Sequence, residues 1–401
     1  MSSPQQQKTV VVIIAIIVLV LVGYGIVHAM CVSRKKKTMM LGACGGFTAA
    51  PQQKISQVAR DWGTLTVQDL IQKYPVGTIL YNDLSQTMKD QINAAIPYVD
   101  NSDLEVTLPT NFDARTKFLN TSSSKAQFPS LINVSSNQGQ CGDCFLVASC
   151  DAISDRMRVY QSFPEFLQPI TYAPPGTGDS YQFLNGLSCY AFLYNSTNAS
   201  KAPSVTNSSG CGGGIPALVF QYINTYGLPN LVCAPPVCDP TKTCPKQDYS
   251  KCQLYKALVV HRSFLDDDDY DTKLYNVSKS IFVFGSVCVT LQIYQSFYDF
   301  FTGTKNADAI YSESVMNSYP GDTLVGGHAV TAIGFGVGPD PKNSTSQIPY
   351  LLIRNSWGLD WNGSGTFKIQ TTICQILGES WDAHMSTSTN PNLPPFDPTR
   401  T

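Results

Sequence analysis

The segment at residues 137–149, NQGQCGDCFLVAS, constrains the fold most, because two cysteines three residues apart lead directly into an apolar run. Apolar residues then recur at steps of three or four through Leu146, Cys150 and Ile153, which predicts a helix with one face in a core. Cys144 falls at the N-terminus of this helix. Unpaired N–H groups and the helix dipole stabilise an anion there, so we expect a lowered thiol pKa and a nucleophilic cysteine.

A nucleophilic cysteine needs a base, and the chain has four histidines. His328 alone lies in a motif, LVGGHAVTAIGFG, in which the alternation at residues 329–335 predicts a strand. A second strand-like run, residues 350–354, ends in NSWG. Asn355 of this tetrapeptide can orient an imidazole, and Trp357 can shield their hydrogen bond from water. The sequence therefore predicts a Cys–His–Asn site.

In this order along the chain, the motifs resemble those of the papain family of cysteine peptidases, specifically the cathepsin B type. The matching stretches are QGQCGDCF, GCGGG, GGHAV and RNSWGLDW, to which LPTNFDAR, AISDR and GTFKI add similarity to cathepsin B. The resemblance covers roughly the last three quarters of the chain. It implies a papain-like α+β fold of two lobes, one helical with Cys144 and one β-barrel-like with His328 and Asn355, with a cleft between them.

The resemblance also implies roles for single residues. Cys144 and His328 would rest as a thiolate–imidazolium pair oriented by Asn355, while the Gln138 amide and the Cys144 backbone N–H would hold the oxyanion. Substrate would contact Gly213, Gly214, Trp357 and Trp361. The expected reaction is peptide-bond hydrolysis through a thioester, without a metal or cofactor.

Two residues beside the nucleophile depart from the family pattern. Phe145 stands where the family usually has tryptophan, and Asp143 where it usually has serine. Phe145 keeps an aromatic ring next to the nucleophile, so we expect activity to survive. Asp143 places a negative charge near the thiolate, which would raise the pKa of the thiol.

The chain contains thirteen cysteines, most of them between residues 141 and 252, which indicates a disulfide framework and an oxidising compartment. The resemblance implies a Cys141–Cys211 bridge. The cysteines expected to supply further bridges are Cys189, Cys233, Cys238, Cys244 and Cys252. Nested pairs, 233 with 252 and 238 with 244, would resemble the base of the cathepsin B occluding loop, although sequence leaves the connectivity open.

The occluding loop of cathepsin B normally carries a histidine pair that binds the C-terminal carboxylate of the substrate. No histidine lies between Cys233 and Cys252, so the sequence favours an endopeptidase. Glu379 follows Cys374 by five residues, where cathepsin B has an acidic residue at the floor of its main specificity pocket. A preference for basic residues is therefore one interpretation.

N-x-S/T triplets recur along the chain and indicate a secretory route, with glycosylation as the expected modification. The candidates are Asn120, Asn133, Asn195, Asn198, Asn207, Asn276, Asn343 and Asn362.

Residues 10–30 form an apolar run long enough to span a bilayer. We favour a membrane anchor over a cleaved signal peptide, because the run is long and lacks a strongly basic start. The basic residues 34–37 would place the body in the cytoplasm by the positive-inside rule. Cysteines and glycosylation triplets instead indicate a secretory or endo-lysosomal lumen, the extracellular side or a virion membrane. The sequence leaves the orientation open.

We divide the remaining chain into a tail at residues 1–9, a propeptide-like region at 31–107, a peptidase domain at 108–385 and a Pro-rich flexible tail at 386–401. In the propeptide-like region, one helix is expected up to Lys73 and another after Ser85. By resemblance this region is an inhibitory propeptide that lies along the cleft. The alternative is a membrane-proximal stalk.

The expected partners are protein or peptide substrates, the chain's own propeptide as inhibitor, and a membrane through the N-terminal segment. A formal net charge of −2 gives no support to nucleic-acid binding. Two other functions compete. One is a thiol–disulfide oxidoreductase that uses Cys141 and Cys144, and the other is a catalytically inactive papain-like binding protein.

Overall fold

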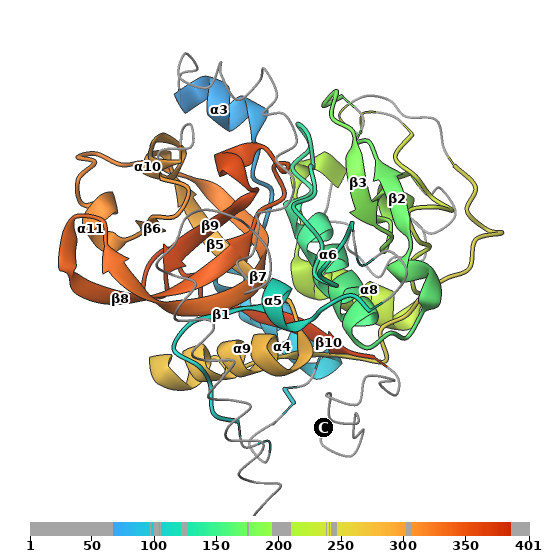
Figure 1. Ribbon diagram of the computed structural model, residues 1–401, viewed down its shortest axis with the longest axis horizontal. Coiled ribbons are helices and arrows are strands. Elements are labelled where there is room, and N and C mark those ends of the chain that lie inside the picture. Colours follow the sequence, from blue (N-terminus) through green and yellow to red (C-terminus); the bar gives the residue numbers. More distant parts are fainter. Residues whose placement is uncertain are drawn as a thin grey trace, which may run out of the picture. The chain divides into compact units, whose positions relative to one another are not determined.

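The computed structural model describes residues 67–385 (Figure 1), except residues 97, 100–103, 105, 122–124, 126, 175, 195–209, 238, 240, 242–246 and 302–305. The contact pattern places all of them in one compact unit, which begins at Ser56. The anchor predicted at residues 10–30 and the tail at 386–401 lie outside the described residues. Within the described part of the chain, no helix has both the length and the apolar character that a membrane span requires.

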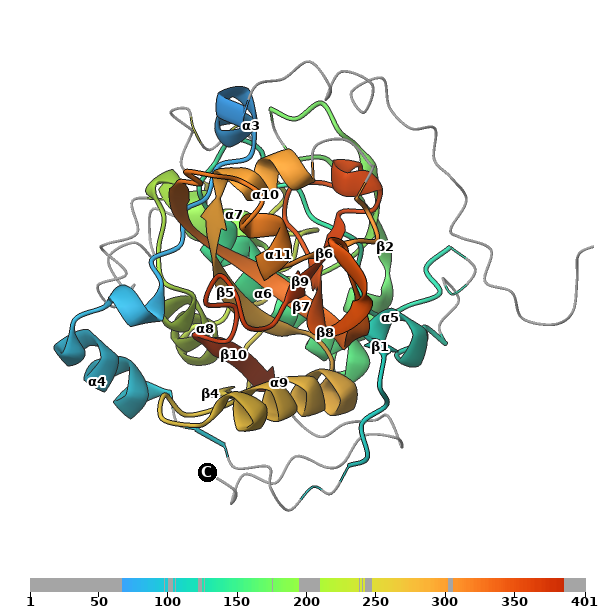
Figure 2. The same ribbon diagram turned by 90° about the vertical axis from the view of Figure 1, so that its left-hand side faces the viewer.

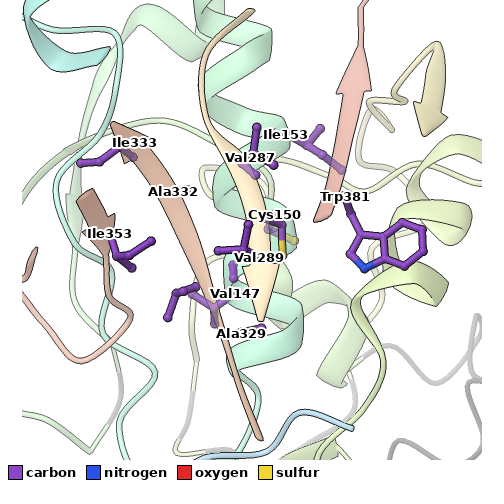
Figure 3. Close-up of a cluster of buried hydrophobic side chains, with 14 of the residues drawn as sticks. Val147, Cys150, Ile153, Val287, Val289, Ala329, Ala332, Ile333, Ile353 and Trp381 are labelled. Atoms are coloured by element: carbon purple, nitrogen blue, oxygen red, sulfur yellow. The ribbon is translucent and has the colours of Figure 1, made fainter. Parts of the chain in front are cut away.

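The predicted helix at the nucleophile is α6, Cys144–Val159, and it forms the centre of the fold. Each of its residues except Asp151 is buried. Figure 3 shows Val147, Cys150 and Ile153 of α6 against the strands of the neighbouring sheet. Because side chains from both elements interlock, burial here fixes the helix against the sheet that carries His328.

A single eight-stranded sheet forms the β-rich lobe, with the strand order β4-β10-β5-β7-β8-β9-β6 and with β1 paired to β7. The strands are β1 (Phe112–Asp113), β4 (Val259–Arg262), β5 (Val287–Tyr294), β6 (Ile310–Tyr311), β7 (Leu324–Asp340), β8 (Asn343–Arg354), β9 (Thr366–Gln370) and β10 (Ser380–His384). All pairs are antiparallel except β6 with β9. Both predicted strands, at residues 329–335 and 350–354, are confirmed within the longer β7 and β8.

The helical lobe lies on the other side of α6, with a two-stranded hairpin at its edge (Figure 1). Its elements are α7 (Cys189–Tyr194), α8 (Pro216–Thr225), β2 (Pro169–Tyr172) and β3 (Tyr181–Leu184). The remaining helices are α3 (Val67–Lys73), α4 (Gln86–Ala95), α5 (Ala114–Lys117), α9 (Tyr270–Phe284), α10 (Gln295–Phe300) and α11 (Glu313–Met316). The α+β architecture with two lobes is therefore confirmed.

The propeptide-like region forms the two helices expected there. α3 ends at Lys73, and the Ser85 side chain accepts a hydrogen bond from the Met88 amide at the start of α4. In Figures 1 and 2, α3 lies at one end of the molecule and α4 near the end where α9 lies. The chain between the two helices therefore has to cross the body of the protein.

Two disulfides are present among the described residues, Cys141–Cys211 and Cys233–Cys252. Both match the expected pairing, while Cys238 and Cys244 lie outside the described residues. The expectation that Cys189 joins a bridge is wrong. Its thiol is free and buried at the start of α7, with the carboxyl of Asp143 nearby.

Three glycosylation candidates lie in the core, so these predictions are wrong for the folded protein. Asn120, Asn133 and Asn362 are at most 4% exposed. The Asn133 amide donates to the Leu184 carbonyl and accepts from the Leu184 N–H, which leaves no room for a glycan. Asn276 is half-buried and Asn343 is exposed, and both stay predictions. The three at residues 195, 198 and 207 lie outside the described residues.

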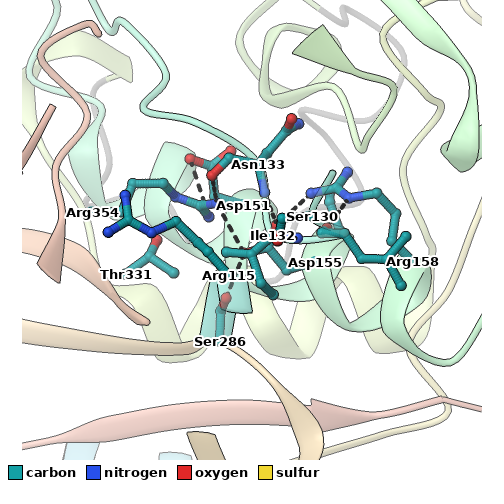
Figure 4. A network of polar contacts seen from close by, with 12 residues as sticks. Arg115, Ser130, Ile132, Asn133, Asp151, Asp155, Arg158, Ser286, Thr331 and Arg354 are labelled. Carbon is teal, nitrogen blue, oxygen red and sulfur yellow. Dashed lines mark hydrogen bonds and ion pairs between the residues drawn. The ribbon is translucent and has the colours of Figure 1, made fainter. Parts of the chain in front are cut away.

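A buried ionic network ties the C-terminal half of α6 to the loop before it and to β8 (Figure 4). Asp155 accepts from the Asn133 N–H at 3.1 Å and from the Ser286 hydroxyl at 2.5 Å. It also pairs with Arg354 at 2.9 Å and with Arg158. Every oxygen of this carboxylate has partners, as a buried charge requires.

The apolar run at residues 281–293 belongs to two elements. Ile281 to Phe284 complete α9, and β5 begins at Val287. Gly285, with φ +101°, ends the helix in a conformation that favours glycine. The apolar run thus divides between a helix and a strand that are both buried, a case in which the composition of the run does not separate the two.

Candidate active site

Cys144 lies at the first position of α6, as predicted, and it is completely buried. Its sulfur lies 3.2 Å from the hydroxyl of Thr78. Backbone N–H groups of Ala329, Gly77 and Phe145 also direct hydrogen bonds to it. The Ala329 contact places the sulfur against β7, one residue from His328.

The structure joins His328 to Asn355 as the sequence predicts. The His328 Nε2 atom lies 2.8 Å from the Asn355 Oδ1 atom, so the ring N–H donates to the amide oxygen. Trp357 stacks on the imidazole, with ring centroids 4.8 Å apart. The other ring nitrogen, Nδ1, has no hydrogen-bond partner among the described residues. With Nε2 protonated, Nδ1 carries the lone pair that a base needs.

Gln138 lies beside the nucleophile with both ends of its amide engaged. Its Nε2 donates to the Cys141 carbonyl at 2.7 Å and to the Pro75 carbonyl at 3.0 Å. Its Oε1 accepts from the hydroxyl of Ser356, which fixes the orientation of the amide. An N–H that reaches a carbonyl of a crossing chain is placed to serve an oxyanion of a substrate there.

Residues 75–80, the covering segment, cross the site between the lobes. The Thr78 N–H donates to the Gly327 carbonyl, and the Ile79 N–H donates to the Gly214 carbonyl, each at 2.9 Å. Gly214 in turn donates to the Gly77 carbonyl at 2.9 Å. A Cβ at Gly77 would lie 1.9 Å from the Gly142 carbonyl oxygen, so only glycine fits there. The propeptide-like region therefore covers Cys144.

Both flanks of the covering segment are fastened to the body. On the α3 side, the Tyr74 ring lies 5.3 Å from the Trp357 ring, and the Tyr298 hydroxyl donates to the Tyr74 carbonyl at 2.8 Å. On the α4 side, the Tyr81 N–H donates to Glu379 Oε1 at 2.9 Å. Sequence reasoning missed Thr78 and Tyr298, although the glycine at position 77 is the kind of signal that marks a close backbone approach.

Glu379 lies in the core, where three donors reach its carboxylate. Besides the Tyr81 N–H, the Thr290 hydroxyl donates to it at 2.7 Å and the Trp381 indole at 2.5 Å. Burial raises the pKa of Glu379, and the hydrogen bonds oppose that rise. The contact with Tyr81 puts this carboxylate next to the chain that occupies the cleft.

The charge states differ from those expected. Burial lowers the pKa of His328 to about 4, although the hydrogen bond that its ring donates to Asn355 opposes the shift. Burial also raises the pKa of Cys144, although the contact with Thr78 opposes that rise. The thiolate–imidazolium pair and the lowered thiol pKa are therefore corrected for the covered form. A thiol and a neutral imidazole rest beneath the covering segment, because burial penalises both charged forms.

Asp143 also differs from expectation. It is 1% exposed, and burial followed by the neighbouring Cys144 raises its pKa well above the usual range. Burial therefore disfavours the negative charge that was expected beside the thiol.

The four residues expected to bind substrate separate into two groups. Gly213 and Gly214 face the covering segment, since a Cβ on Gly213 would lie 2.5 Å from the Gly77 carbonyl oxygen. Trp357 lies over His328 and beside Tyr74. Trp361 instead packs among Phe297, Phe301 and Phe367 in the β-rich lobe and is 3% exposed. Its ring also lies 5.2 Å from the Trp357 ring, and its assignment to substrate binding stays a prediction.

Buried at the junction of two lobes, a cysteine on a helix N-terminus and a histidine–asparagine pair on a sheet define the class of papain-like proteins. The family model described as papain family cysteine protease matches residues 193–383. The matched region includes His328 and Asn355 and begins after Cys144. The chain is thus similar to papain family cysteine proteases, and its relatives include cathepsin B-like proteinases.

Those relatives are distant in sequence. A cathepsin B-like cysteine proteinase 3 from Caenorhabditis elegans is 27% identical over 288 residues, which cover 68% of this chain and 64% of the relative. A cathepsin B-like cysteine proteinase from Schistosoma japonicum is 24% identical over 299 residues, 68% of this chain and 71% of the relative. The chain thus spans about two thirds of the nematode protein.

A solved structure shows the same fold. Procathepsin B from Trypanosoma congolense aligns with a TM-score of 0.51 and 19% identity, over 80% of this chain and 89% of the other. At this identity the likeness concerns the fold alone.

Proposed function

We propose that the chain is a cysteine-type endopeptidase that is made as a zymogen, with Cys144 as nucleophile, His328 as base and Asn355 as the residue that orients it. The observation that supports this most is that Cys144, Gln138 and Gly327, the residue before His328, all contact one crossing backbone, residues 75–80. That backbone lies where a peptide substrate would lie.

The proposed chemistry follows from the hydrogen bonds. Once the covering segment leaves, water reaches the site and the penalty on charge falls, so the Cys144 proton passes to His328 Nδ1. The thiolate attacks the carbonyl carbon, and the Gln138 Nε2–H with the Cys144 backbone N–H stabilises the oxyanion. His328 then protonates the leaving amine. Water hydrolyses the thioester, with His328 as base, and restores the thiol.

The covering segment explains how the zymogen stays inactive. Gly77 and Thr78 occupy the space above the sulfur, and the Gln138 N–H that would serve the oxyanion is used by the Pro75 carbonyl. No peptide bond of a substrate can reach Cys144 until residues 75–80 move away. We therefore propose that removal of this segment, by cleavage before the peptidase domain, starts activity.

The disulfides favour the peptidase over the oxidoreductase. Cys141 is bonded to Cys211, with the two Cα atoms 4.6 Å apart, so it is not available to pair with Cys144. The Cys233–Cys252 bridge closes a loop whose sequence has no histidine. We propose cleavage inside peptide chains, because this loop lacks the groups that would bind a terminal carboxylate.

The test uses the full chain after limited proteolysis in front of residue 108 and internally quenched peptides with both termini blocked. We expect cleavage by the wild type, none by Cys144→Ala, and retained cleavage by Cys150→Ala, which removes another buried thiol of α6. Absence of cleavage by folded wild type, with no labelling of Cys144 by an epoxysuccinyl inhibitor, would overturn the proposal and favour the inactive binding protein.

We further propose that residues 10–30 anchor the zymogen, with the peptidase domain in a lumen or outside the cell, where its disulfides persist. Extraction of membranes with alkaline carbonate should leave the full chain in the pellet and release a chain that lacks residues 1–37. Release of both would contradict the anchor.

A further inference from the structure

Asp143 occupies the N-cap position of α6, yet its side chain caps no amide of the helix. An N-cap aspartate ordinarily accepts a hydrogen bond from the second or third amide and stays ionised. Here the Oδ1 atom has no hydrogen-bond partner among the described residues. The carboxyl is 1% exposed, so bulk solvent does not surround it. A buried carboxyl next to the nucleophile is thus held without the contacts that would stabilise its charge.

Thiols are the titratable groups that face this carboxyl. They are Cys144 and Cys150 of α6 and Cys189 of α7. None of the three can supply a positive charge. Within the described part of the chain, the carboxyl receives a hydrogen bond from the backbone N–H of Asp143 itself. Burial therefore outweighs the stabilisation of the ionised form and raises the pKa of Asp143 well above its usual range.

We propose that Asp143 is a positioning residue that confines the peptidase to acidic and neutral conditions by controlling the charge next to Cys144. While Asp143 is uncharged, the amides and dipole at the start of α6 stabilise the thiolate. When Asp143 loses its proton to solvent at higher pH, a second negative charge lies beside the sulfur. The imidazolium of His328 then returns its proton to the sulfur, and the resulting thiol and neutral imidazole cannot begin the reaction.

The sign of the effect follows from like-charge repulsion. At a pH where Asp143 is ionised, its charge disfavours the thiolate, so the proton moves from the His328 imidazolium to the sulfur and the fraction of thiolate–imidazolium pair falls. An amide or a hydroxyl at position 143 would remain uncharged at every pH. Replacement should therefore extend activity toward alkaline pH and leave the acidic limit in place.

This inference rests on the proposed function and is tested on the full chain after removal of the covering segment. The pH dependence of kcat/KM and of the alkylation rate of Cys144 by iodoacetamide is compared for wild type, Asp143→Asn and Asp143→Ser. We expect the alkaline limb of both variants to move upward by about one pH unit or more, with the acidic limb unchanged. A matched control is Asp151→Asn, which removes another carboxyl of α6 and should leave the profile unmoved.

The outcomes are separable. Superimposable profiles of active wild type and Asp143→Asn would overturn the role of Asp143 and leave the peptidase standing. Wild type that neither cleaves peptide nor alkylates at Cys144 would overturn the proposed function itself. Failure of both neutral variants to fold would also contradict the inference, because an uncharged carboxyl with an unpartnered oxygen contributes little to stability.

Discussion

Both ends of α6 bury polar side chains deeply, but the two ends differ in whether those side chains have hydrogen-bond partners. In the second half, Asp155 is fully buried and each of its carboxylate oxygens is paired with an arginine. Asp143 at the start of α6 and His328 on β7 are buried just as deeply, and each keeps one polar atom without a hydrogen-bond partner in the described part of the chain. One helix thus carries a carboxylate, Asp155, with both oxygens paired, and another, Asp143, with one oxygen unpaired among the described residues.

This difference predicts which residues contribute to the stability of the fold and which contribute to catalysis. A paired buried charge repays its desolvation only while every partner stays in place, so its loss destabilises the fold. An unpaired buried group contributes little to folding, but its protonation state is free to change when a ligand or solvent arrives. We therefore expect substitutions near Cys144 to change rates and substitutions near Asp155 to change the free energy of unfolding.

The largest effect is expected from His328→Ala. Loss of the base should lower kcat/KM by roughly 10⁴-fold or more, because the nucleophile and base act as one unit. The free energy of unfolding should stay near that of wild type, since the imidazole makes one side-chain hydrogen bond. Kinetics with quenched peptides and urea unfolding measure the two. A large loss of stability would contradict the claim that substitutions near Cys144 change rates and leave the free energy of unfolding unchanged.

Asp155→Ala should give the opposite result. Removal of this carboxylate leaves Arg354 and Arg158 buried without their partner, which should cost about 3–5 kcal/mol of unfolding free energy. The matched control is Asp151→Ala, whose carboxylate is 16% exposed and lies 3.7 Å from Arg354; we expect a loss of about 1 kcal/mol. Urea unfolding in the Cys144→Ala background, which prevents self-digestion, checks both. Equal losses of unfolding free energy in the two variants would show that the buried ion pairs of Asp155 do not determine stability.

Gln138→Ala tests whether a single hydrogen-bond donor of the site contributes to catalysis. Loss of one oxyanion donor should lower kcat by about 10²- to 10³-fold. Gln182→Ala, on the exposed hairpin strand β3, is the control and should leave kcat unchanged. If Gln138→Ala raised KM alone, the amide would be a ground-state contact with substrate.

Gly77→Ala tests whether the covering segment, residues 75–80, blocks access to Cys144. The added Cβ clashes with the Gly142 carbonyl, so the covering segment should bind less well, by about 1–3 kcal/mol. Labelling of Cys144 in the uncleaved chain should therefore speed up by roughly tenfold or more. Gln86→Ala, on the exposed face of α4, should label as slowly as wild type. Unchanged labelling of Gly77→Ala would place the control of activity elsewhere.

Sequence periodicity predicted what depends on neighbours along the chain. The spacing of Leu146, Cys150 and Ile153 located α6, and the alternation after His328 located β7. The charge states could not be predicted, because the burial of Cys144 depends on Thr78, 66 residues earlier. The surroundings of Trp361 could not be predicted for a similar reason, since a motif does not reveal which aromatic rings pack around its tryptophan.

The most direct test measures the alkylation of Cys144 by iodoacetamide at neutral pH in the intact chain and after proteolytic removal of the residues before 108. A buried thiol beneath residues 75–80 should react slowly, and removal should speed modification of Cys144 by roughly a hundredfold or more, as its thiolate forms. His328→Ala should lose that gain. Equal rates before and after removal would contradict a peptidase site that its own chain holds closed.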